Sequence, residues 1–228
     1  MRLFHAAIIA ATGGLFLTAC APTIGGNWLN ATSVRPSGKV ISKDRGLSGF
    51  ESVALSGLGE VVLAQGANDI VVVEADDNIQ QHLIAEVKDG VLNLRIADNI
   101  SFSGSPTIRY LITLKSIKSV SISGLGRVRG ANIDTSALSV SVSGGGDVLL
   151  NGKAAIQTAS ISGLGKLDLA NLSGKTGSVD ISGAGDATVN VSDALNVSIS
   201  GLGSVHYKGA PELSQKISGG GNVTPVQP

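Results

Sequence analysis

The chain has 228 residues, enough for one large domain or two small ones. Aromatic residues make up 3% of it and glycine occurs 31 times, so we expect an aliphatic core and a chain that turns often. This composition favours stacked β structure. The formal net charge is zero and there is no long run of Lys or Arg, which argues against nucleic acid as a partner and against a polybasic membrane patch.

The first 19 residues have the organisation of an export signal. Met1 and Arg2 form a short positive region, and residues 3–16 are mostly apolar but too short to span a membrane comfortably as a helix. The sequence LTAC at residues 17–20 then matches the bacterial lipobox, and Cys20 is the only cysteine of the chain. We therefore predict a lipoprotein signal peptide at residues 1–19 and a lipid anchor on Cys20.

A lipid on Cys20 would attach the mature protein to a membrane and leave it with neither a free thiol nor a disulfide. Ala21 follows the cysteine, and by similarity to lipoprotein sorting in Gram-negative bacteria the lack of Asp there indicates the outer membrane. Residues 20–45 are rich in Gly, Ser, Thr, Asn and Pro without an apolar period, which predicts a flexible tether.

Residues 46–115 are expected to form a β-rich N-terminal part without strict periodicity. The segments FESVALSGLGEVVL at 50–63, IVVVE at 70–74 and TIRYLITL at 107–114 carry strand signals. Asp76 or Asp77 could cap a short helical turn at residues 78–82. The dipeptide Asp89-Gly90 separates two strand candidates and suits a type I′ hairpin, because Gly accepts a positive φ.

Residues 116–228 repeat one phrase, SISGLG and its close copies. The Ser-Gly-x-Gly elements are spaced by 20, 19, 20, 18 and 18 residues, and an earlier copy begins at Ser56. They begin at Ser123, Ser143, Ser162, Ser182, Ser200 and Ser218. This spacing predicts an all-β fold, a right-handed parallel β-helix whose coils have roughly 19 residues each, with a division into two β-helical parts as a variant.

Each copy carries apolar residues on both sides of its glycines. Those before the Ser are expected to form one inward ladder along the stack, and those after the second Gly a second ladder. The first comprises Ile122, Val142, Ile161, Ile181, Ile199 and Ile217, and the second Val128, Val148, Leu167, Ala187, Val205 and Val223. Between the ladders, Gly-x-Gly lets the backbone turn a corner.

Residues at the corner alternate from coil to coil, so that the repeating unit is a pair of coils. The x position reads Leu125, Gly145, Leu164, Ala184, Leu202 and Gly220. Two residues later come Arg127, Asp147, Lys166 and Asp186, followed by Ser204 and Asn222. Alternation relieves crowding of leucines and repulsion of like charges, and we interpret the charge row as a structural device that fixes register.

Several patterns that resemble functional sites are better explained by the repeat. Gly174-Lys175-Thr176 resembles the end of a P-loop, but Leu169 stands where that motif needs a glycine. The segment SGGGD at 143–147 resembles a calcium-binding nonapeptide at doubled spacing, so weak calcium binding stays open. His82 and His206 lack the spacing of a metal site or catalytic triad. We expect no cofactor, no metal and no catalytic residue.

The order of these features resembles a bacterial family, the putative auto-transporter adhesin, head GIN domain. The resemblance covers roughly residues 50–223. It rests on GFESVALSGLGEVVLAQG, VKDGVLNLRI, RYLITL and the repeated SISGLG, all behind a lipobox. It implies a right-handed β-helix of three-sided coils, often in two parts, and a surface or envelope protein without established catalytic residues.

We therefore predict an outer-membrane lipoprotein that displays a non-catalytic β-helix, facing the periplasm or the surface, and binds glycan or protein. Flat solenoid faces suit extended partners. One alternative is an enzyme that cleaves a polysaccharide, for which Asp147, Asp168, Asp180, Asp186 and Asp193 are the candidate carboxylates. The other is a structural envelope component, although Pro225 and Pro228 argue against open-ended stacking of coils.

Overall fold

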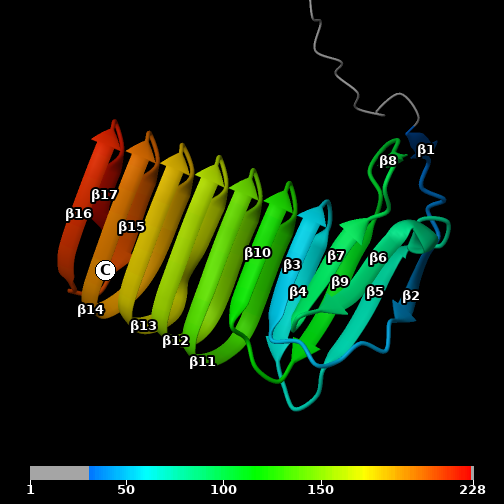
Figure 1. The fold of residues 1–228 in the computed structure, drawn as a ribbon, viewed down its shortest axis with the longest axis horizontal. Helices are drawn as coiled ribbons and strands as arrows, with labels where there is room; N and C mark the ends of the chain where they lie inside the picture. Colours follow the sequence, from blue (N-terminus) through cyan, green and yellow to red (C-terminus); the bar gives the residue numbers. More distant parts are fainter. Residues whose placement is uncertain (1–30, 227–228) are drawn as a thin grey trace, which may run out of the picture. The chain divides into compact units, whose positions relative to one another are not determined.

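The computed structural model describes residues 31–226, which belong to one compact unit built from β-strands and a single 3₁₀ segment, η2 (Gln80–His82). The predicted all-β parallel β-helix is confirmed: parallel strands stack side by side along one axis (Figure 1). In this part of the chain, no helix has the length and apolar character needed to cross a membrane.

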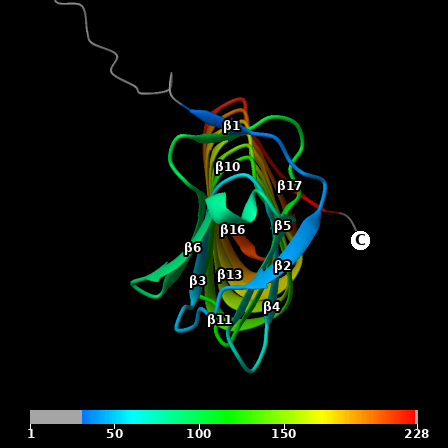
Figure 2. The same cartoon turned by 90° about the vertical axis from the view of Figure 1, so that its right-hand side faces the viewer.

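The strands lie on two faces that enclose the core (Figure 2). The first face runs in the order β6 (Leu83–Lys88), β7 (Val91–Ile96), β3 (Ser52–Gly57), β10 (Ser119–Gly124), the C-terminal halves of β11 (Arg127–Gly144), β12 (Asp147–Gly163), β13 (Lys166–Gly183) and β14 (Asp186–Gly201), and β16 (Glu212–Gly219). Strands β11 to β14 are long because each bends from the second face into the first, with a shift in register.

The second face continues the same stack on the other side of the core. Its order is β2 (Val40–Asp44), β5 (Ile70–Asp76), β9 (Ile108–Leu114), β4 (Glu60–Gln65), the N-terminal halves of β11 to β14, β15 (Ser204–Lys208) and β17 (Asn222–Pro225). A separate pair of short strands, β1 (Thr32–Val34) and β8 (Ile100–Phe102), lies outside this sheet.

The two predicted aliphatic ladders form the core of the repeat. Ile122, Val142, Ile161, Ile181 and Ile199 pair in strict register along the first face, and each side chain is at most 2% exposed. Alternation along each strand places the neighbouring serines outward. The second ladder is equally buried from Val128 to Val205, and only the last coil exposes its members.

Antiparallel strands close the N-terminal end of the stack. Strand β5 pairs antiparallel with β9 and β2, and β6 pairs antiparallel with β7. The β6–β7 turn has positive φ at both Asp89 (52°) and Gly90 (75°), as the type I′ prediction requires. Since β3 pairs with both β7 and β10, the predicted N-terminal part, residues 46–115, and the repeat, residues 116–228, share one continuous sheet.

Two details at this end differ from the sequence-based expectations. Residues 32–34 and 40–44, assigned to the flexible tether, form strands because the edges of β8 and β5 offer unpaired backbone groups there. The 3₁₀ segment has no side-chain cap. The buried Asp76 carboxylate instead accepts hydrogen bonds from the backbone N–H of Gly38 (2.7 Å) and Thr107 (3.0 Å), which joins β5 to two loops.

The corner glycines allow the coils to approach closely. Gly144 has φ +118°, and a Cβ on it would lie 2.7 Å from the carbonyl oxygen of Gly124 in the preceding coil. At Gly145, which has no such φ, a Cβ would meet only the flexible end of Leu125 at 3.0 Å. The first glycine of each phrase is therefore required by backbone geometry, whereas the x position tolerates a side chain.

We expect Gly144→Ala to lower the free energy of unfolding by about 1–3 kcal/mol, because the new methyl group combines an unfavourable φ with a backbone clash. Gly145→Ala, in the same corner, should cost much less. Urea unfolding followed by circular dichroism compares the two variants. Equal losses would show that the φ at Gly144 is not the constraint.

A second property of the core is the phenol of Tyr110 on β9, which is fully buried and has no hydrogen-bond partner among the described residues. Burial raises the pKa of Tyr110 to about 12, and the charge of Arg45 acts in the opposite direction. The folded state therefore keeps this phenol neutral at pH values at which the unfolded chain ionises it.

The free energy of unfolding should fall as pH rises from about 10 to 12, by up to about 1.4 kcal/mol per pH unit from this group alone. Tyr110→Phe should lose this part of the pH dependence. At neutral pH it should be at least as stable as the parent, because it removes a hydroxyl that is buried without a partner. Urea unfolding of both proteins across this pH range tests the assignment, and identical pH profiles would refute it.

Candidate functional site

The predicted charge row lies on the second face, next to the corner. Arg127 pairs in register with Asp147, Asp147 with Lys166, and Lys166 with Asp186. The row continues with Ser204 and Asn222 toward the C-terminal end. Successive strands therefore present opposite charges at equivalent outward positions, about 4.8 Å apart along the backbone ladder.

Only one of these neighbouring pairs of residues forms a direct ion pair within residues 31–226. The Arg127 guanidinium lies 3.3 Å from the Asp147 carboxylate, and both side chains are about half exposed (52% and 49%). In the described part of the chain, neither Lys166 nor Asp186 belongs to an ion pair. The register role of the row therefore remains a prediction, and Lys166 offers an ammonium group that forms no ion pair with a carboxylate of residues 31–226.

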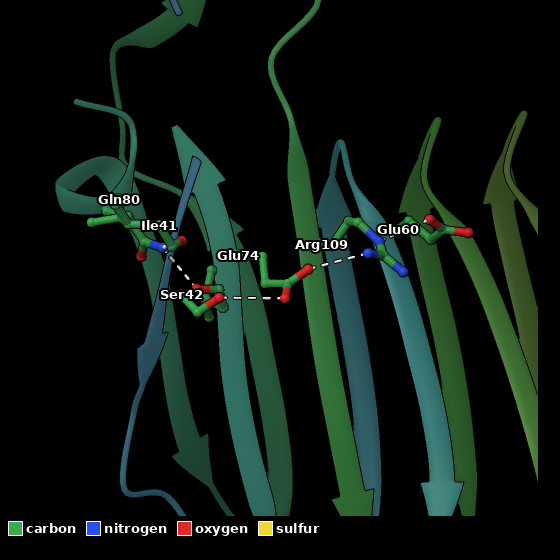
Figure 3. Close-up of polar contacts among 7 residues, drawn as sticks. Ile41, Ser42, Glu60, Glu74, Gln80 and Arg109 are labelled. Carbon is green, nitrogen blue, oxygen red and sulfur yellow. Dashed lines mark hydrogen bonds and ion pairs between the residues drawn. The ribbon is translucent and has the colours of Figure 1, made fainter. Parts of the chain in front are cut away.

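The structure extends the alternation toward the N-terminal end. Glu60 occupies the position before Arg127, Arg109 pairs with Glu60, and Glu74 pairs with Arg109. Arg109 contacts both carboxylates, Glu74 at 3.1 Å and Glu60 at 3.4 Å, and the Ser42 hydroxyl donates to Glu74 at 3.3 Å (Figure 3). Arg129 reaches Glu60 at 3.5 Å. We call the whole series, Glu74, Arg109, Glu60, Arg127, Asp147, Lys166 and Asp186, the charge row.

A shallow cleft of about 420 Å³ opens over the middle of the charge row, on β11, β12 and β13. Its charged lining comes from Arg127, Arg129, Asp147, Lys166 and Asp168, and Leu149 adds an apolar patch. The Asp168 carboxylate accepts a hydrogen bond from the backbone N–H of Ala170 (3.1 Å). Three cations and two carboxylates thus surround a space open to solvent, an arrangement suited to a ligand with anionic groups and hydroxyls.

An apolar ridge runs beside the charge row, along the corner. Leu125, Leu164 and Leu202 are 72%, 75% and 70% exposed. Small residues separate them, and a Cβ on Gly145 or Gly220 would lie 3.0 Å from the preceding leucine, so these side chains lean over the small residue of the next coil. We call these three residues the leucine ridge. It offers regularly spaced apolar contacts next to the cleft.

The other sequence-based candidates do not assemble into a site. Asp180 faces outward on the first face, whereas Asp147, Asp168 and Asp186 lie on the second. His82 lies in η2, and His206 lies in β15, where its Nδ1 is 2.9 Å from the Thr224 hydroxyl. Residues 31–226 contain no group of three or more His, Cys, Asp or Glu placed to hold a metal ion. Cys20 lies outside the described residues.

Charge reversal at Asp147 tests the register role of the row. Asp147→Lys would place three cations side by side, and we expect the free energy of unfolding to fall by about 1 kcal/mol in dilute salt. The loss should shrink at high salt, which screens exposed charges. Asp180→Lys, whose neighbours in register are Ser160 and Ser198, is the matched control. A loss at Asp147 that does not depend on salt would rule out the electrostatic role.

Comparisons with known proteins agree with this architecture. Residues 49–211 match the family described as "Putative auto-transporter adhesin, head GIN domain". A structure described as a putative adhesin from Bacteroides fragilis is similar, with a TM-score of 0.69 and 25% sequence identity over 85% of this chain and 100% of that one. No curated protein matches the chain.

Two further structures share the fold at lower identity. One, from Parabacteroides distasonis, is described as a putative lipid binding protein and has a TM-score of 0.53 at 19% identity over 86% of this chain and 100% of that one. The other, a putative adhesin from Parabacteroides merdae, has a TM-score of 0.50 at 19% identity over 86% of this chain and 99% of that one. The family model covers most of the chain, and the repeated sequence segments and the β-helix agree with it. The chain therefore belongs to the putative auto-transporter adhesin, head GIN domain family.

Proposed function

We propose that this protein is an adhesion protein of the cell envelope. It is anchored in the outer membrane through a lipid on Cys20 and binds an acidic glycan or protein through the cleft on its second face. Membership of an adhesin family and the similarity to a structure described as a putative adhesin support a role in adhesion. The lipobox supports the anchor, since acylation of one cysteine attaches a soluble domain to a bilayer.

The observation that carries the binding site is the arrangement of cations around the cleft. Arg127 and Arg129 each contact one carboxylate, whereas Lys166 contacts none within the described part of the chain. A ligand carboxylate or sulfate can pair with Lys166 without breaking an existing ion pair. The leucine ridge beside the cleft adds apolar contacts, which a purely electrostatic site would lack.

The site favours binding over catalysis. Hydrolysis of a glycan generally uses two carboxyl groups on opposite sides of the scissile bond, one of them with a raised pKa. In the cleft, Asp147 is paired with Arg127 and Asp168 accepts a backbone hydrogen bond, so each carboxylate already has a donor from the protein itself. We therefore assign a non-catalytic role to both residues.

The test uses the full chain with Cys20→Ser, which cannot be acylated at that position. Immobilised peptidoglycan and a panel of acidic and neutral glycans and matrix proteins are offered, and both retention and released fragments are measured. We expect retention on acidic partners, without fragments, that weakens as salt increases. Lys166→Glu should reduce the affinity at least about 10-fold, which corresponds to the loss of one charge-assisted contact.

The matched control is Lys175→Glu, the same charge change at an exposed position of the same strand, β13. It should bind like the parent protein. Equal weakening by both variants would show that net charge, and not the cleft, governs binding. Release of fragments that stops on Asp147→Asn or Asp186→Asn would instead establish the alternative of a polysaccharide-cleaving enzyme.

A further inference from the structure

The two ends of the stack differ in how they are closed. At the N-terminal end, antiparallel strands and η2 cover the core (Figure 2), and Ile79 and Leu83 are at most 3% exposed, although β6 and β2 each have one edge unpaired within residues 31–226. At the C-terminal end, β16 pairs only with β14 and β17 only with β15, so each has one edge unpaired within residues 31–226. Core positions are exposed as a result: Ile217 is 39% exposed, whereas Ile199, its neighbour in register, is 1% exposed.

The sequence of this last coil departs from the repeat at an inward position. Gln215 pairs in register with Val197, and the same row contains only aliphatic residues in the preceding coils of the repeat. These are Val120, Val140, Ala159, Val179 and Val197, all at most 4% exposed. An amide at this point needs a polar partner if anything covers the edge, since a buried amide without a hydrogen bond is costly.

A second copy of this chain supplies such a partner. If a two-fold axis passes beside Gln215, β16 pairs antiparallel with the β16 of the other copy, and Leu213 lies opposite the partner's Ile217. The two Gln215 amides then face each other, and each can donate to and accept from the other. Glu212 becomes the diagonal neighbour of the partner's Lys216, within reach of an ion pair. The edge is thus complementary to itself in apolar contacts, amides and charge.

We propose that two copies join end to end through their β16 edges to form a closed, two-fold symmetric dimer. A two-fold contact uses the same surface on both copies and leaves no free β16 edge, so this contact closes at two copies.

Pro225 limits the hydrogen-bonded contact to β16. The backbone N–H of Val226 donates to Tyr207 (2.8 Å), so in the alternating pattern of a parallel ladder residue 225 faces the free edge. Proline has no N–H to offer there. For Pro225 this agrees with the expectation from the sequence that it opposes open-ended stacking, whereas Pro228 lies outside the described residues.

The test measures the oligomeric state of the full chain carrying Cys20→Ser, which has no other cysteine. Size-exclusion chromatography with light scattering should give twice the chain mass at high concentration. Ile217→Lys should give a monomer with an unchanged circular dichroism spectrum, because it places a cation in the apolar part of the contact, opposite Leu213 of the second copy. Ile156→Lys, at a 53% exposed position of β12, should leave the dimer intact.

Crosslinking gives an independent readout that does not depend on a destabilising substitution. Gln215→Cys should form a disulfide-linked dimer on mild oxidation, because directly opposed hydrogen-bonded residues in antiparallel strands have Cα atoms about 5.5 Å apart, within disulfide range. Ser160→Cys, outward on the first face, should not. A parent protein that stays monomeric, a dimer that survives Ile217→Lys, or assemblies larger than two copies would each overturn the proposal.

Discussion

Backbone pairing between successive coils is the interaction on which the rest of this structure depends. Parallel ladders require that equivalent residues of neighbouring coils lie about 4.8 Å apart over the whole circuit. The corner is the tightest point of that circuit, because the carbonyl of one glycine lies against the α-carbon of the next. The sequence satisfies this constraint by repeating one phrase whose first residue after the serine is always glycine. Each coil is stabilised in the same conformation by its contacts with the neighbouring coils.

Once the register is fixed, residues at equivalent outward positions of successive coils form a row along the stack. The rows of serine, leucine and charge are therefore products of the scaffold, and variation within a row changes the surface without disturbing the core. The charge row shows this freedom: its N-terminal part forms a linked set of ion pairs around Arg109 and Glu60, whereas Lys166 and Asp186 remain unpaired in the described chain. The same row thus forms ion pairs at its N-terminal end and, within the described residues, offers charges without an ion pair at its C-terminal end.

Much of the fold could be predicted because the sequence repeats with a nearly constant spacing. The spacing of the Ser-Gly-x-Gly elements gave the coil length and both aliphatic ladders, and the position after the second glycine identified Arg127 to Asp186 as one row. Glu60 was accessible by the same alignment, through the copy at Ser56. Arg109 and Glu74 were not, because β9 and β5 join the row through pairings between segments that share no phrase with the repeat.

The strands within the expected tether escaped prediction for a related reason. Their segments are polar and short, and only the edges they pair with make them strands. The hydrogen bonds that the Asp76 carboxylate accepts from Gly38 and Thr107 likewise join loops that are distant in sequence. A local pattern cannot report such contacts, and these are the contacts by which the N-terminal end departs from the repeat.

The order of cap and coils along the chain has a consequence for how the protein matures. Every strand that closes the N-terminal end precedes β10 in the sequence. A chain that emerges from an export channel with its N-terminus first can complete that end, and the first turn of β3 and β4, before the repeat has been translocated. During such an export each later coil would find a finished edge to add to, so assembly would be vectorial and the exposed edge would move outward with the growing chain.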